Sequence, residues 1–168
     1  MTMMIMTRIN NGKRFEQNWK NSVPKDIFYY RLRDGSSSWG GNENVRFQAE
    51  NICDSIMFDG DYLYTLELKS TKGKSLPFNN IKKHQIDDLL RCSSYSNVIA
   101  GFVIEFNELS ECYFIEISRF KTFYDTTNRK SLSLQFCREN GIKIGVEKIK
   151  INRKFDIEKF LKESVKYI

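Results

Sequence analysis

Three residues whose side chains could act together on a phosphate group lie within residues 54–69: Asp54, Glu67 and Lys69. Two neighbouring carboxylates can bind a divalent cation through their oxygens. A lysine two positions beyond the second carboxylate projects from the same face of a strand and can offset charge on a phosphate. These residue types at this spacing are typical of metal-dependent phosphodiester cleavage.

A β-hairpin is the element that must bring the two carboxylates together. The apolar residues of 56–66 are interrupted at Gly60-Asp61, and a two-residue turn there would be of type II′. Counting outward from this turn places Asp54 opposite Glu67, on one face and with Cβ atoms roughly 4.5–5.5 Å apart. A turn one residue longer would put the two carboxylates on opposite faces, so the predicted metal site depends on this register.

The pattern Glu-x-Lys is weak by itself, because charged residues alternate on many solvated strands. The residues around Glu67, within 62–68, are apolar on both faces, which indicates a strand buried on both sides. An acid and a lysine at the end of such a strand are unusual unless they have a function. The neighbours therefore favour the site over the solvated strand.

Length and composition predict one compact domain over residues 1–168 and a polyanionic partner. The chain has a net charge of +6 and a pI near 9.1, and it is 40% hydrophobic and 14% aromatic. No apolar run approaches the length of a membrane span, which favours nucleic acid over membrane. Four widely separated cysteines and one histidine argue against zinc and indicate reduced thiols in a cytoplasmic protein.

The periodicity of apolar residues predicts an α/β domain with a mixed central β-sheet flanked by helices. Before the first hairpin we expect a helix over 13–22, a strand over 28–32 and a loop insertion over 34–44. After it we expect a lysine-rich loop at 70–75, a helix over 80–92, a second hairpin from 97–105 and 112–117, helical stretches near 119–124 and 131–140, a basic strand over 142–151 and a helix over 156–166. Gly141 is expected to end the fourth helix as a C′ residue.

Several ordered blocks resemble the RecU-type Holliday junction resolvases of the PD-(D/E)xK nuclease superfamily. These blocks are Asn10-Asn11-Gly12-Lys13 with Phe15-Glu16, Cys53-Asp54, Glu67-Leu68-Lys69-Ser70-Thr71, Pro77-Phe78-Asn79-Asn80-Ile81 with His84-Gln85, Gly101-Phe102-Val103-Ile104, and Tyr113-Phe114-Ile115. The resemblance covers residues 10–124. Glu-x-Lys is common to the whole superfamily, whereas the Asn-Asn-Ile and His-Gln block is much more specific.

The resemblance implies a restriction-endonuclease-like core and a homodimeric, Mg²⁺-dependent endonuclease, with Mn²⁺ as a substitute. Such an enzyme resolves four-way DNA junctions by paired nicks that leave 5′-phosphate ends. Asp54 and Glu67 match the metal-binding acids, Lys69 the active-site lysine, Glu16 the acid on the first helix, and Gln85 the glutamine on the helix after the hairpin. Without the resemblance, Glu16 and Gln85 would indicate only solvated helix faces.

Two segments depart from the family pattern. Residues 51–53 lack the hydroxyl-rich stretch that is common in the family. The family's protruding stalk corresponds to residues 34–49, a flexible insertion in which no residue aligns. The resemblance therefore leaves open how this chain engages the centre of a junction.

Cations around the predicted site are candidates for DNA contacts, which position DNA without reading its sequence. The candidates are Lys72, Lys74, Lys82 and Lys83 beside the site, Arg31, Arg33 and Arg46 at the base of the insertion, and Trp39 for stacking on bases. A charge run is usually a solvated face, and Trp39 could equally pack on the protein. His84, beside two lysines, is more typical of a surface residue than of a catalytic one, and Glu105 is more typical of a carboxylate at a strand edge.

Two alternative functions remain open from the sequence. The chain could be another PD-(D/E)xK nuclease that cuts duplex DNA or flaps. It could also be a non-catalytic protein that binds branched DNA, although the intact acids and lysine argue against lost catalysis.

Overall fold

A six-stranded sheet forms the centre of the computed structural model, which describes residues 10–33 and 50–167. The strands lie in the order β1 (Phe28–Arg31), β2 (Ser55–Phe58), β3 (Leu63–Thr71), β5 (Val98–Phe106), β6 (Glu111–Glu116) and β8 (Ile142–Ile144). β3 and β5 are parallel, and the other neighbouring pairs are antiparallel. The sheet is therefore mixed, as predicted.

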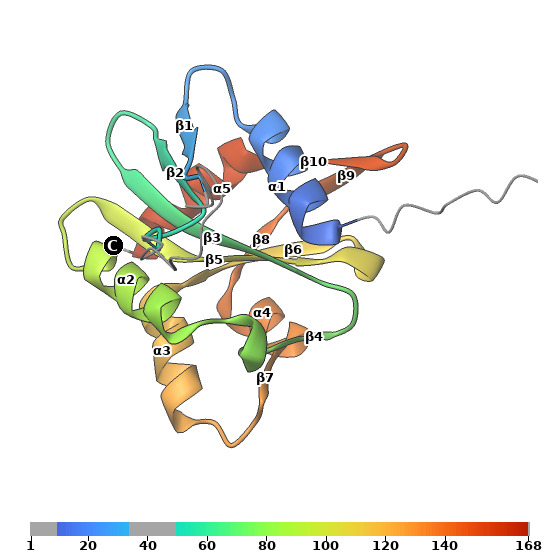
Figure 1. Ribbon diagram of the computed structural model, residues 1–168. Coiled ribbons are helices and arrows are strands. Elements are labelled where there is room, and N and C mark those ends of the chain that lie inside the picture. Colours follow the sequence, from blue (N-terminus) through green and yellow to red (C-terminus); the bar gives the residue numbers. More distant parts are fainter. Residues whose placement is uncertain (1–9, 34–49, 168) are drawn as a thin grey trace, which may run out of the picture.

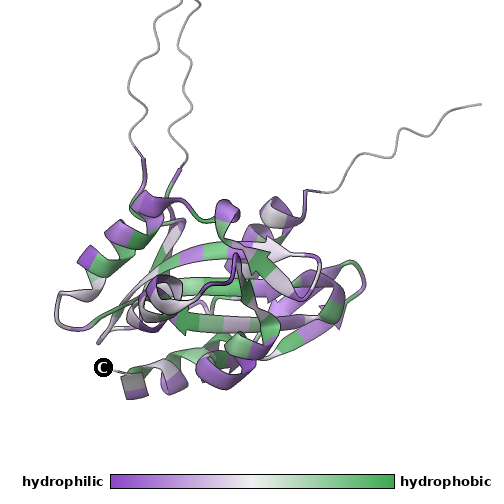
Figure 2. Ribbon diagram, turned by 90° about the horizontal axis from the view of Figure 1, so that it is seen from below, coloured by the Kyte–Doolittle hydropathy of each residue, from purple (hydrophilic) through white to green (hydrophobic). Residues whose placement is uncertain are grey.

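Helices cover both faces of this sheet (Figure 1). One face is covered by α1 (Asn11–Ser22) and α5 (Ile157–Ser164), and the other by α2 (Lys83–Ser93), α3 (Ile117–Thr126) and α4 (Leu134–Asn140). Green, hydrophobic residues dominate the strands in Figure 2, whereas the helices alternate between hydrophobic and hydrophilic residues. This layering confirms the α/β fold class, because each amphipathic helix buries its apolar side on the sheet.

The first hairpin has the predicted register. Phe58 pairs with Leu63 and Ser55 with Leu66, so the next pair outward is Asp54 and Glu67. At the turn, Gly60 has φ +105°, a conformation that glycine adopts without a steric penalty. The Oδ1 atom of Asp59 accepts hydrogen bonds from the backbone N–H groups of Asp61 and Tyr62, which closes the turn.

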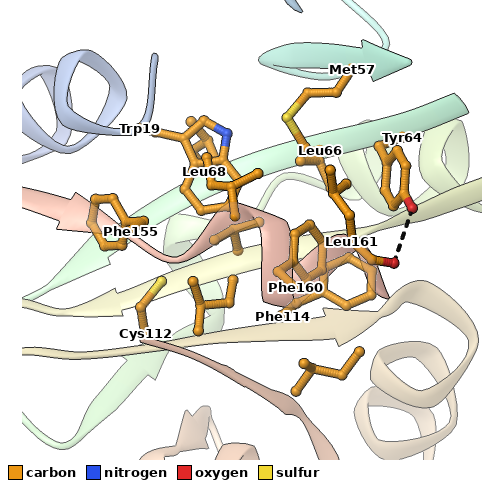
Figure 3. Packing of buried hydrophobic residues seen from close by; sticks show 14 of the residues in the cluster. Trp19, Met57, Tyr64, Leu66, Leu68, Cys112, Phe114, Phe155, Phe160 and Leu161 are labelled. Carbon is orange, nitrogen blue, oxygen red and sulfur yellow. Dashed lines mark hydrogen bonds between the residues drawn. The ribbon is translucent and has the colours of Figure 1, made fainter. Parts of the chain in front are cut away.

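The core on the α1 and α5 face is rich in aromatic residues (Figure 3). Trp19 of α1 lies 5.6 Å from the ring of Phe155 and 6.1 Å from that of Phe160 in α5. Phe160 in turn lies 5.0 Å from Phe114 of β6. These contacts join both helices to the middle of the sheet and fix α1 beside β3.

The predicted basic strand over 142–151 is wrong in its extent. The segment divides into β8 and β9 (Val146–Ile149), and β9 forms a separate two-stranded hairpin with β10 (Asn152–Phe155). The chain reverses at Lys150, whose φ is +56°. A non-glycine residue rarely adopts this conformation, so the sequence carried no ordinary signal for a turn.

Two predicted helices begin later than expected. The helix over 80–92 starts at Lys83, after a 3-10 turn at Phe78–Asn80. The segment 131–140 begins as β7 (Ser131–Ser133), which pairs with β4 (Ser75–Pro77), and α4 follows with Ser133 as its N-cap. The other predicted elements lie within a few residues of the observed ones.

Gly141 ends α4 without the expected left-handed conformation. Its φ is −105° and its ψ is 170°, which is extended backbone. A Cβ atom there would lie 2.5 Å from Cδ1 of Ile115 and 2.9 Å from the carbonyl oxygen of Phe114. Close packing of the helix end on β6 therefore explains the glycine.

The single domain over residues 1–168 stays a prediction, and the predicted insertion at 34–49 lies outside the described residues. Within residues 10–33 and 50–167, no helix is both long and apolar enough to cross a membrane. All four cysteines are free thiols, as expected.

Candidate active site

Asp54 is held at the end of β2 by the backbone of its partner strand. Its N–H donates to the carbonyl oxygen of Leu66 at 3.1 Å, and its Oδ2 atom accepts from the N–H of Leu68 at 2.8 Å. The second bond uses the N–H of the residue that lies between Glu67 and Lys69. The strand that carries the acid and the lysine thus also orients the first carboxylate.

Glu67, Lys69 and Gln85 form one hydrogen-bonded cluster between β3 and α2. The ammonium group of Lys69 lies 3.1 Å from Oε1 of Glu67 and donates to Oε1 of Gln85 at 3.2 Å. The Nε2 atom of Gln85 donates to Oε1 of Glu67. The same Gln85 oxygen accepts from the N–H of Lys82 at 2.9 Å, which anchors the amide at the start of α2.

Burial makes the two carboxyl groups unusually hard to ionise. Glu67 is only 3% exposed, and burial followed by the negative charge of Asp54 raises its pKa to about 7. Burial also raises the pKa of Asp54, against the opposing effects of the Leu68 N–H and the Lys69 charge. Neighbouring acids with raised pKa values are typical of functional sites.

The chemistry of this donor set fits a divalent cation. Two adjacent carboxylates with one lysine leave an excess negative charge when both are ionised, and a bound cation would remove the repulsion between them. No group of three or more histidine, cysteine, aspartate or glutamate side chains suited to a metal occurs among the described residues. The candidate site therefore rests on Asp54 and Glu67, with room for water or phosphate oxygens as further ligands.

Glu16 lies beside this cluster but is engaged elsewhere. Its Oε2 atom is 2.6 Å from Nε of Arg31 in β1. The charge of Glu16 contributes to the raised pKa of Asp54, which places the two groups within electrostatic range. None of the described hydrogen bonds or ion pairs joins Glu16 to Asp54, Glu67 or Lys69.

The four lysines that are predicted to contact DNA are all exposed. Lys72 and Lys74 lie in the turn between β3 and β4, and Lys82 and Lys83 lie at the start of α2. Arg33 is exposed, and Arg31 is partly buried by its pairing with Glu16. Trp39 and Arg46 lie outside the described residues.

The expectations for His84 and Glu105 have different outcomes. His84 is a partly buried surface residue whose Nδ1 atom lies 3.0 Å from Glu50, consistent with a role outside the chemistry. Glu105, which the sequence suggests is a carboxylate at a strand edge, is instead 1% exposed in the central strand β5. It accepts from Ser70 at 2.8 Å and pairs with Arg153 of β10 at 3.0 Å.

The sequence did not single out two cations on α1. Lys13 and Lys20 lie on the same helix face as Glu16 and line a groove against β1. Their spacing of seven residues is the signal that could have found them, because residues separated by two helical turns share a face.

Comparison with known proteins identifies relatives over most of the chain. The Recombination protein U (RecU) family matches residues 13–162. The SPbeta prophage-derived uncharacterized protein YotM of Bacillus subtilis is 31% identical over 173 residues, covering 94% of this chain and 88% of that protein. The Holliday junction resolvase RecU of Staphylococcus aureus strain JH9 is 32% identical over 87 residues, which is 49% of this chain and 41% of that protein.

A solved structure supports the fold independently. Hjc of Archaeoglobus fulgidus, a Holliday junction resolvase, superposes with a TM-score of 0.50 at 14% identity and covers 79% of this chain and 95% of its own. At this identity the likeness concerns the fold alone, and it confirms the restriction-endonuclease-like arrangement of sheet and helices. Because the family match spans nearly the whole described chain, the protein belongs to the Recombination protein U family.

Proposed function

We propose that this protein is a structure-selective endonuclease that uses a divalent cation to resolve four-way DNA junctions by paired nicks. The observation that carries the proposal is the cluster of Asp54, Glu67, Lys69 and Gln85, which joins two acids, a cation and an amide within a RecU-family chain. The basic net charge of +6 suits a polyanionic substrate.

Asp54 and Glu67 would bind Mg²⁺, with Mn²⁺ as a substitute. When bound, the cation supplies an activated water and offsets charge on the phosphate oxygens. Lys69 is placed to stabilise the negative charge that develops on the phosphate, because its ammonium group lies in the same cluster as the acids. Gln85 positions Lys69 and Glu67 through its two hydrogen bonds and restrains both side chains before the substrate arrives.

Glu16 has a supporting role in the proposal. Its carboxylate could join the outer coordination sphere of the cation from α1, provided that its pairing with Arg31 is released. The exposed cations Lys72, Lys74, Lys82 and Lys83 would contact backbone phosphates and position the strand without reading its sequence.

We further propose that the enzyme acts as a homodimer, because a four-way junction offers two equivalent strands to cut. Support comes from three aromatic side chains on the neighbouring strands β1 and β2: Phe28, Tyr30 and Phe58 are 56%, 49% and 43% exposed. β1 is also an edge strand of the sheet. Exposed apolar groups at a sheet edge suit the burial that a second copy would provide.

The prophage-derived relative suits action in the cytoplasm of a bacterial or phage-infected cell.

The test compares a labelled four-way junction with a linear duplex and a flap of the same sequence. Purified protein should nick the junction symmetrically with Mg²⁺ or Mn²⁺ and should leave it intact with chelator. Equal cleavage of all three substrates would instead identify a general PD-(D/E)xK nuclease. Junction binding without cleavage under any metal condition would identify a non-catalytic branched-DNA-binding protein.

A further inference from the structure

A groove between α1 and β1 has a volume of about 620 Å³ and lies outside the catalytic cluster. Four cationic side chains line it. Lys13 and Lys20 belong to α1, Arg31 is the last residue of β1, and Arg33 follows β1. Among the described residues that line it, Glu16 is the only carboxylate. The lining therefore carries a net charge of +3, which is well suited to a polyanion.

The helical side of the groove presents its charges in a row. Lys13, Glu16 and Lys20 are three and four residues apart, so they lie along one face of α1. A rise of 1.5 Å per residue separates the two lysines by roughly 10 Å along the helix. That distance is about the axial rise of three nucleotides in one strand of B-DNA. The row can thus contact more than one phosphate of a single strand.

The strand side of the groove borders the catalytic acids directly. Arg31 pairs with Ser55 in the β1–β2 ladder, next to Asp54. The N–H of Leu32 donates to the carbonyl oxygen of Asp54 at 2.9 Å. A DNA strand that follows the groove therefore passes the backbone of Asp54, whose side chain lies with that of Glu67 on the face of the sheet that α2 covers.

We propose that this groove binds the phosphodiester backbone of a DNA strand next to the cleavage site. The inference rests on the proposed nuclease function and extends it, because it adds Lys13 and Lys20 and a second contact surface on the opposite face of the sheet. Glu16 modulates this surface: its carboxylate binds Arg31 and lies among the cations that would contact phosphate.

The test measures DNA affinity by fluorescence anisotropy in chelator, so that cleavage cannot contribute. The probes are a labelled single-stranded oligothymidylate, a linear duplex and a four-way junction. The variant Lys13→Ala/Lys20→Ala should bind at least one of them about tenfold more weakly. The slope of log affinity against log salt should fall by about 1.4 for the single strand or about 1.8 for a duplex, as expected for two lost phosphate contacts.

The controls separate local contacts from net charge. Lys159→Ala/Lys162→Ala removes two exposed lysines from α5 and changes the net charge equally, but it should leave the salt slope unchanged. Lys13→Arg/Lys20→Arg should restore affinity, because arginine keeps both charges. Equal losses in the groove variant and the α5 variant would overturn the inference, as would unchanged binding of all three probes.

The substitution Glu16→Gln gives an opposite and more specific expectation. It removes the carboxylate that competes with phosphate for Arg31, so DNA affinity should rise by about threefold or more at low salt while nicking slows. Weaker binding of Glu16→Gln would count against the groove.

The three probes also distinguish binding of an unpaired strand from binding of a paired arm. Together with the nicking assay, they separate the groove proposal from the nuclease proposal. A loss confined to the oligothymidylate would show that the groove binds an unpaired strand, and a loss on duplex and junction would show that it binds a paired arm; both support the groove. If the groove variant loses affinity but no protein preparation ever nicks DNA, the groove stands and the nuclease proposal fails. If nicking is metal-dependent but the groove variant binds normally, the nuclease stands and the groove fails.

Discussion

The metal-free protein should lose stability as the pH rises toward 8, with Glu67 as a main cause. Its folded-state pKa of about 7 lies above the ordinary value of 4.5. Between these values the folded state binds more protons than the unfolded state, so the free energy of unfolding decreases as pH increases. The stabilising proton is fully present below the unfolded pKa and is lost as the pH rises through the folded pKa.

The size of the effect follows from the displacement of the Glu67 pKa. A rise from 4.5 to about 7 corresponds to at most about 3.5 kcal/mol, since one pKa unit is equivalent to about 1.4 kcal/mol. The amide of Glu67→Gln imitates the neutral acid but cannot ionise. We therefore expect the stability of the variant relative to the wild type to increase by about 2.5 kcal/mol between pH 5 and pH 8, because the folded-state pKa of about 7 lies within this window.

Urea unfolding of both proteins in chelator, at intervals from pH 5 to pH 8, measures this difference. Glu147→Gln is a suitable control, because Glu147 is exposed on β9 and its substitution should leave the pH dependence unchanged. Adding Mg²⁺ at pH 8 should stabilise the wild type, in which Asp54 and Glu67 are the proposed metal ligands, and should stabilise Glu67→Gln much less. Parallel stability curves for wild type and Glu67→Gln would refute the reasoning about burial.

Three other predictions concern catalysis, the core and assembly. Asp54→Asn and Lys69→Ala should each lower the nicking rate by roughly 10²–10³-fold in a junction assay, because they remove the proposed metal ligand or the charge proposed to stabilise the transition state. Arg153→Ala should lower the free energy of unfolding by about 3–5 kcal/mol in urea, because it leaves the buried Glu105 carboxylate unpaired. Phe58→Ser should shift the protein from about twice the chain mass toward the monomer in light scattering, because it removes an exposed ring from the proposed interface.

Each of these predictions has a defined control. Junction binding should persist in Asp54→Asn, and a wild-type nicking rate in that variant would contradict the site assignment. Lys154→Ala, an exposed neighbour of Arg153, should change stability by less than about 0.5 kcal/mol, and an equal loss in both variants would contradict the buried pair. Tyr95 lies between α2 and β5, and its side chain is 66% exposed. Tyr95→Ala removes this aromatic ring and should leave the mass in light scattering unchanged.

The register of the first hairpin could be read from the sequence because the periodicity of a strand is two and the turn is short. Gly60 marks the turn, and counting outward then places Asp54 opposite Glu67 with no further information. The same local logic identifies α1, since aromatic residues at four-residue spacing make one buried face and Pro24 follows its end. The central acids and lysine were therefore predictable from short-range rules.

Other features were decided by tertiary structure, because they join segments far apart in the chain. Gln85 reaches Glu67 and Lys69 only because α2 packs on the face of the sheet that carries them. Glutamate is a residue type that is usually exposed. The burial of Glu105 depends on its pairing with Arg153, which lies 48 residues later in the chain. The turn at Lys150 likewise places a non-glycine residue at positive φ, against its local preference. Local propensity and periodicity determine the strands and their register, whereas the neighbours of a buried charge depend on which distant elements pack together.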